Sequence, residues 1–146
     1  MSVRLGRFME RSGVLPTTQF DYRKGLGTWD ALLCVSHTLQ SALENGQEAR
    51  IVQIDFSAAF DRVNNLGILY KLCSVGIGGS VLFILTEFLS NRSQQVMSDF
   101  CRSTLVNVVS GVPQASVLGP LLFLMYTSEL FPFWKISWSV MLMISL

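Results

Sequence analysis

A carboxylate at the end of a predicted strand is the first feature of the sequence that could support chemistry. Asp55 closes the apolar, β-branched run Arg50–Ile54, and Asp61 follows six residues later. Oxygen ligands held at such a rigid position are what a hard cation such as Mg²⁺ requires. The alternative is that Asp55 caps the next turn and that Asp61 pairs with Arg62 or Lys71, and capping is the commoner role for an aspartate in this position.

A loop rich in glycine and proline is the second such feature. Ser110-Gly111-Val112-Pro113-Gln114 runs into the apolar segment Val117–Leu130. A loop of this kind before a helix can present backbone amides and a glutamine side chain to a ligand. The alternative is an ordinary loop in which Ser116 caps a core helix.

The third feature, Gln19–Gly25, combines a basic pair with aromatic residues. Its pair Arg23-Lys24 stands beside Phe20 and Tyr22, a combination that suits contacts with phosphates or bases. Taken alone the signal is weak, because most basic pairs are solvated surface.

Helices and strands must position these residues. Thr28 is expected to cap a helix with Asp30 in its first turn, and Gly46 is expected to end that helix. A turn or short helix is expected over 57–63, and a turn is expected after a loop or short helix in 1–27. The patterns predict helices over 28–43, 66–75, 80–90 and 117–130, a strand over 50–56, and hairpin strands over 94–97 and 104–109. The predicted class is α+β, with helices packed on a few strands.

Composition excludes several functions. Half of the 146 residues are hydrophobic, 14% are charged, and the mean hydropathy is +0.44, which suits the buried part of a larger protein. A net charge of +1 gives no global basic field, although residues 1–24 carry a local net charge of +3. Three dispersed cysteines and one histidine argue against a zinc site and for a reduced compartment. The first residues lack the apolar core of a signal peptide, so an intracellular protein that is not secreted is expected.

Together and in order, these segments resemble the reverse transcriptase domain of LINE-like, jockey-type non-LTR retrotransposons. Gln19–Leu33 is similar to the fingers pattern Q-x-G-[FY]-R-x-x-x-S-T-x-D-A-L of that family. Asp55–Val63 is similar to L-D-F-S-K-A-F-D-R-V, polymerase motif A. Gly76–Gln94 resembles G-I-…-F-L-x-x-R-x-Q, and Ser110–Phe123 resembles motif B, S-G-V-P-Q-G-S-V-L-G-P-L-L-F.

The resemblance implies roles for single residues. Asp55 would be the catalytic carboxylate that binds both Mg²⁺ ions, with the carbonyl of Phe56 as a further metal ligand. Phe60 would be the steric gate against the ribose 2′-OH. Gln114, with Ala115 next to it, would lie beside the incoming nucleotide and the template, and Arg23 would contact the nucleotide or template. Asp61 would be structural.

Three substitutions depart from the family pattern. Asp21 and Gly27 stand where the family has Gly and Ser, and Ala115 replaces the glycine of P-Q-G. A glycine at that position permits a positive φ or a close backbone approach, so a methyl group is expected to crowd the nucleotide site.

The largest departure is the lack of motif C, [YF]-A-D-D, which would supply two further carboxylates. The sequence has no acidic residue after Glu129. Codons can be chosen for Pro132–Ile144 that encode a different peptide when they are read one base earlier. That peptide is Ile-Leu-Glu-Asn-Lys-Leu-Val-Gly-Tyr-Ala-Asp-Asp. The two Trp and two Met residues in the stretch each have a single codon, so those codons are fixed. We hypothesise a one-base deletion or two-base insertion near codon 131. The alternative is a genuine hydrophobic tail.

These observations predict a truncated fragment in which residues 1–130 are a partial fingers and palm lacking motif C and the thumb, and residues 131–146 are an apolar, frameshifted tail. The parent would extend a DNA primer on an RNA template with dNTPs and Mg²⁺, and this chain would not turn over. One alternative is a non-catalytic remnant that binds nucleic acid weakly. The other is a small protein anchored to a membrane by its tail, although sixteen residues with Lys135 are short of the roughly 20 that a span needs.

Overall fold

A computed structural model describes residues 1–129 and 140–145 of the chain. These residues form two compact units, one made of residues 1–59 with the described part of 127–146, and the other of residues 60–126. Both helices and strands are present, and the strands make three two-stranded sheets. The fold is therefore mixed α and β, as the sequence predicts.

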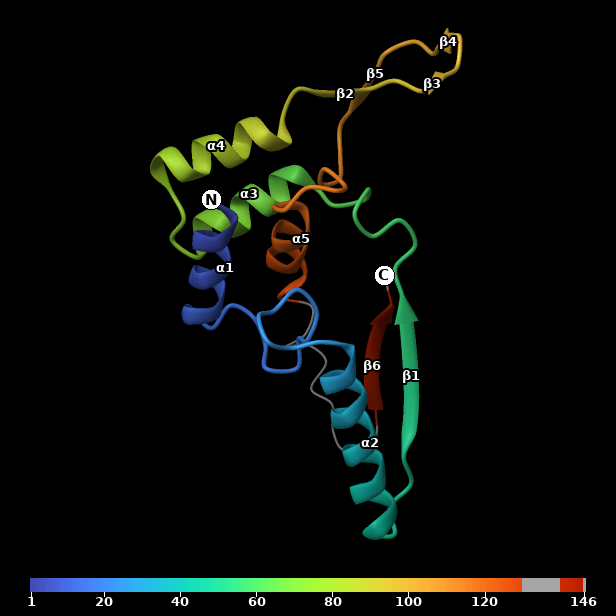
Figure 1. The fold of residues 1–146 in the computed structure, drawn as a ribbon. Helices are drawn as coiled ribbons and strands as arrows, with labels where there is room; N and C mark the ends of the chain where they lie inside the picture. Colours follow the sequence, from blue (N-terminus) through green and yellow to red (C-terminus); the bar gives the residue numbers. More distant parts are fainter. Residues whose placement is uncertain (130–139, 146) are drawn as a thin grey trace. The chain divides into compact units, whose positions relative to one another are not determined.

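The first unit holds two helices and one parallel strand pair, β1 (Arg50–Asp55) with β6 (Val140–Ser145) (Figure 1). The register runs from Arg50 opposite Val140 to Asp55 opposite Ser145. The sequence predicts β1 correctly, but it does not predict β6, because that segment was expected to be a chance peptide. The remaining tail residues, 130–139 and 146, lie outside the described part of the chain.

The helices of this unit are α1 (Ser2–Arg11) and α2 (Thr28–Glu44). The predicted cap of α2 is wrong by one residue: Gly27 is the N-cap, and its backbone N–H donates to Asp30 Oδ2 at 2.8 Å. Asp30 occupies the third helical position, where its carboxylate can satisfy this amide. Gly46, at φ +69°, ends the helix as predicted, since a left-handed residue there lets the chain leave the helix.

The second unit contains α3 (Asn65–Ser74), α4 (Gly79–Leu89) and most of α5 (Gly119–Thr127). Asn64 caps α3 by accepting a hydrogen bond from the Gly67 amide at 3.0 Å. The core of this unit is apolar and consists of fully buried side chains: Val63, Ile68, Leu72, Leu85, Leu89, Leu122 and Met125. The predicted helices are confirmed, with α5 shorter at both ends than expected.

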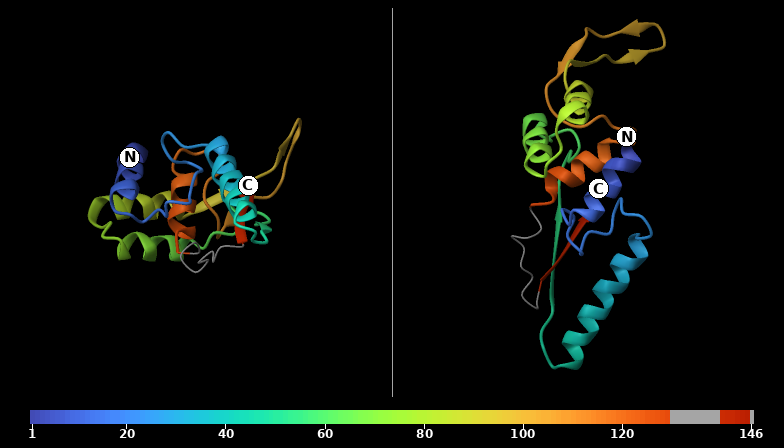
Figure 2. Two further views of the ribbon diagram at one scale, coloured as in Figure 1. Left: turned by 90° about the horizontal axis from the view of Figure 1, so that it is seen from below. Right: turned by 90° about the vertical axis from the view of Figure 1, so that its left-hand side faces the viewer.

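A long hairpin projects from the helices of the second unit (Figure 2). Its base pairs β2 (Arg92–Gln94) with β5 (Val106–Val108), and its tip pairs β3 (Met97–Ser98) with β4 (Cys101–Arg102), both antiparallel. The sequence predicts the hairpin, but it places the first strand at 94–97 instead of 92–94, and it does not predict the separate ladder at the tip. No described helix is long and apolar enough to cross a membrane.

Candidate nucleotide and template site

Asp55 is the last residue of β1, and its side chain is exposed. Phe56 follows it directly as the chain leaves the strand, with 40% of its surface exposed. The β-branched run before them explains why a strand forms and where it ends. Within the described residues, no three His, Cys, Asp or Glu side chains are grouped so that they could hold a metal ion.

Phe60 lies in the turn of motif A that follows β1, named here the motif A turn. It is half-buried, and its ring stacks on that of Phe123 in α5, with centroids 4.7 Å apart and planes at 29°. Offset aromatic pairs of this geometry add stability beyond the area that they bury. The stack fixes the ring of the predicted steric gate against α5, the helix in which motif B ends.

The motif A turn and the motif B loop are joined by three hydrogen bonds. The amide of Gly111 donates to the Val63 carbonyl at 2.7 Å, and the amide of Val112 donates to the Phe60 carbonyl at 2.9 Å. The hydroxyl of Ser110 donates to the Asp61 carbonyl at 2.9 Å. These bonds hold two segments that are about fifty residues apart in sequence in one rigid arrangement.

Gly111 is required where the loop meets the turn. Its φ is +82°, and a Cβ there would lie 2.8 Å from the Cα and carbonyl oxygen of Asp61 and from the carbonyl oxygen of Phe60. These are backbone atoms, which cannot swing aside as a flexible side chain can. The glycine of the motif therefore serves both backbone conformation and close approach.

The side chains of Gln114 and Asp61 meet in the same arrangement. Gln114 Nε2 donates to Asp61 Oδ1 at 2.7 Å. The alternative that pairs Asp61 with Arg62 or Lys71 is wrong, because the partner shown is the glutamine of motif B. A charged acceptor makes this a stronger bond than one between neutral groups, and it orients the Gln114 amide.

Arg92 supports the same loop, a role that the sequence analysis did not predict. Its Nη2 donates to the carbonyl oxygens of Ser110 and Gly111, and its Nε donates to the Leu89 carbonyl at 3.1 Å. A guanidinium has several donors in a fixed plane, so it can join the end of α4 to the loop. The sequence feature that could have indicated this role is the arginine in the segment resembling F-L-x-x-R-x-Q.

Ala115 adopts φ +56°, in the left-handed region that favours glycine. The departure from P-Q-G therefore places a side chain where the backbone conformation disfavours one. The alternative in which Ser116 caps the next helix is supported, because its Oγ accepts a hydrogen bond from the Gly119 amide at 2.9 Å.

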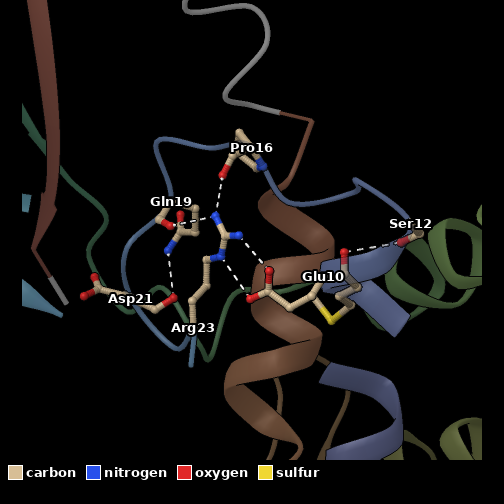
Figure 3. A network of polar contacts seen from close by, with 7 residues as sticks. Glu10, Ser12, Pro16, Gln19, Asp21 and Arg23 are labelled. Carbon is tan, nitrogen blue, oxygen red and sulfur yellow. Dashed lines mark hydrogen bonds and ion pairs between the residues drawn. The ribbon is translucent and has the colours of Figure 1, made fainter. Parts of the chain in front are cut away.

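Arg23 lies at the centre of a polar network in the first unit (Figure 3). Its Nε and Nη2 donate to the two carboxylate oxygens of Glu10 at 3.0 and 2.7 Å, and its Nη1 donates to the carbonyls of Pro16 and Gln19. The hydrogen bond from Arg23 lowers the pKa of Glu10 from its ordinary value, and the same bond raises the pKa of Arg23. The guanidinium holds the loop after α1, so its predicted contact with a nucleotide or template stays a prediction.

Comparison with known proteins identifies the family. The model of the family described as reverse transcriptase (RNA-dependent DNA polymerase) matches residues 2–144. The chain belongs to the reverse transcriptase family. No solved structure matches it significantly.

The relatives of this reverse transcriptase fragment are mobile-element proteins. It is 35% identical over 121 residues to the RNA-directed DNA polymerase from mobile element jockey of Drosophila funebris, covering 83% of the chain and 13% of that protein. It is 32% identical over 130 residues to the probable RNA-directed DNA polymerase from transposon X-element of Drosophila melanogaster, covering 89% and 14%. The chain thus corresponds to a small part of the RNA-directed DNA polymerases of non-LTR retrotransposons.

The reverse transcriptase fragment divides its predicted site between the two units. Phe60, Gln114 and Ala115 belong to the second unit, where hydrogen bonds and the aromatic stack fix the motif A turn against the motif B loop. Asp55 and Arg23 belong to the first unit with Phe56. The structure therefore brings together the residues predicted to lie beside the incoming nucleotide. The predicted metal ligands, Asp55 and Phe56, belong to the other unit.

Proposed function

We propose that the chain is the motif A and motif B part of a retrotransposon RNA-directed DNA polymerase, made of palm and part of the fingers, and that it does not polymerise. The parent enzyme would add dNTPs to a DNA primer on an RNA template. The observation that carries the proposal is the joined arrangement of motif A turn and motif B loop, with Gln114 bonded to Asp61 and Phe60 stacked on Phe123.

Reverse transcriptases use divalent metal ions, and the residues of this chain do not fit a pair of Mg²⁺ ions. Asp55 is one carboxylate, and no described group of three acidic, histidine or cysteine side chains surrounds it. A two-metal site needs several anionic oxygens to hold both ions against their hydration. The family resemblance places Asp61 outside the metal-binding set, and one of its carboxylate oxygens accepts a hydrogen bond from Gln114.

A frameshift near codon 131 would explain why the carboxylates are absent. Permitted codons for Pro132–Ile144, read one base earlier, can encode Tyr-Ala-Asp-Asp after motif B, where the family has motif C. In this proposal residues 1–130 are the reverse transcriptase part of the chain. Residues 131–146 are an apolar tail that is translated in a shifted reading frame.

Primer extension tests the absence of turnover. The full chain and an Asp55→Ala variant are given an RNA template, an annealed DNA primer, dNTPs and Mg²⁺, and the product is resolved by length. We expect no extension above the variant. Extension that requires metal and disappears in Asp55→Ala would contradict the proposal, because one carboxylate would then suffice.

Binding of nucleic acid without turnover is a second candidate function. It is favoured by the basic residues of 1–24, which carry a net charge of +3. Such binding weakens steeply with added salt, because each phosphate contact releases counterions. A salt-insensitive interaction would count against it.

A further inference from the structure

Helix α1 is amphipathic in charge as well as in hydropathy. Leu5 and Met9 are buried, whereas Arg4, Arg7 and Arg11 are exposed. At 3.6 residues per turn, the three arginines fall within an arc of about 60° on the side away from the two buried residues. The arginines therefore form one basic face, named here the α1 arginine face.

The α1 arginine face borders an open cavity of about 430 Å³. Phe8 is half-buried beside the arginines, so an aromatic ring stands next to the three cations. The residues that line the cavity are Arg4, Arg7, Phe8, Arg11 and Ser12. Cations interleaved with an aromatic ring are the combination used to bind single-stranded nucleic acid.

The charge of this face is not neutralised within the described part of the chain. No ion pair or side-chain hydrogen bond involves Arg4, Arg7 or Arg11 among the described residues. The one acidic residue of the helix, Glu10, gives both carboxylate oxygens to Arg23 (Figure 3). The pairing of Glu10 with Arg23 therefore leaves three guanidinium groups for an external anion.

We infer that the α1 arginine face binds the phosphodiester backbone of a nucleic acid, an inference that rests on the proposed origin of the chain. The face extends about 10 Å along the helix from Arg4 to Arg11, which is long enough to contact more than one phosphate of a single strand. Guanidinium groups bind phosphates through paired hydrogen bonds. Phe8 adds a ring on which a base can stack.

Fluorescence anisotropy with a labelled single-stranded RNA tests the assignment. Arg4, Arg7 and Arg11 are replaced together by Gln, which keeps helix propensity, and circular dichroism checks that both proteins are folded. The dependence of log K on log salt concentration should lose a slope of about 2, since each contact with a single strand contributes about 0.7. Affinity at low salt should fall roughly tenfold to a hundredfold.

A matched control carries the same loss of charge elsewhere. Arg50, Arg62 and Arg102 are exposed and lie away from α1 in the sequence, so replacing these three by Gln should leave most of the slope intact. Equal losses in both triple variants would overturn the assignment to α1 while leaving the proposed function standing. If the unmodified chain binds neither RNA nor DNA, the inference and the nucleic-acid contact of the proposed function both fail.

Anionic vesicles of phosphatidylserine and phosphatidylcholine provide the competing surface. We expect the unmodified chain to bind RNA in preference to these vesicles. Vesicle binding that is lost on replacing the α1 arginines, with RNA binding unchanged, would overturn the inference, since the face would then serve a membrane.

Discussion

Replacement of Gly111 by alanine should separate the motif A turn from the motif B loop at a measurable cost in stability. The residue has φ +82°, and a left-handed conformation costs an L-residue about 1–2 kcal/mol. The added Cβ would also lie 2.8 Å from three backbone atoms of Phe60 and Asp61, and forced overpacking costs about 1–3 kcal/mol. The loss of unfolded-chain entropy on Gly→Ala returns about 0.4–1 kcal/mol, so we expect a net loss of about 2–4 kcal/mol.

Gly76 offers a control within the same unit. Its φ is +88°, close to that of Gly111, but a Cβ there would meet nothing within 4 Å. Gly76→Ala therefore carries the conformational cost without the clash, and we expect a loss of only about 1 kcal/mol. The difference between the two variants measures the close approach of the two motifs.

Urea unfolding followed by far-UV circular dichroism gives both free energies of unfolding. Linear extrapolation to zero urea is suitable for comparing variants with equal slopes. If Gly111→Ala costs no more than Gly76→Ala, the contact between loop and turn does not exist in solution, and the geometry of the candidate site is refuted.

Three further changes have predicted outcomes. Ala115→Gly should raise the free energy of unfolding by about 0.5–1 kcal/mol, because it removes left-handed strain at φ +56°, and unchanged stability in urea would show that the strain is absent. Gly27→Ser should add a few tenths of a kcal/mol by capping α2, since φ −160° suits a serine and its Cβ position meets only Asp30 Oδ2, at 4.0 Å; a lower melting temperature would contradict this. Glu10 has a lowered pKa because of Arg23, so its contribution to stability should be present above the ordinary value of 4.5 and lost as pH falls below it. Glu10→Gln should flatten that part of the stability-pH profile, and an unaltered profile would refute the ion pair's contribution.

Local pattern was sufficient to predict much of the fold. Periodic apolar residues predict α2, α3 and α4 to within a residue or two, and the β-branched run before Asp55 predicts β1. These elements follow from side-chain periodicity and from the conformational preferences of single residues, both of which are properties of a short window.

Contacts between distant segments could not be predicted in this way. The bond between Gln114 and Asp61 joins residues 53 apart, whereas the sequence around Asp61 suggests only nearby charged partners. The role of Arg92 was missed for the same reason, because its acceptors are backbone carbonyls, which carry no sequence signature. The cap of α2 was misplaced by one residue, since Gly27 contributes an amide and no side chain.

The strand β6 could not be predicted from an apolar tail that lacks alternation. Its pairing with β1 is made by backbone groups, which any apolar residue can provide. The hairpin tip was missed because a two-residue ladder is too short to show a period of two.

The coding DNA across codons 128–146, read together with the sequence beyond them, tests the central claim most directly. The account predicts that the frame starting one base earlier reads Tyr-Ala-Asp-Asp and continues as an open frame. The carboxylates missing from the chain would then be present in the gene, and the lack of turnover would follow from their loss. A shifted frame without that string would contradict the frameshift, and the tail from residue 131 onward would be a genuine part of the protein.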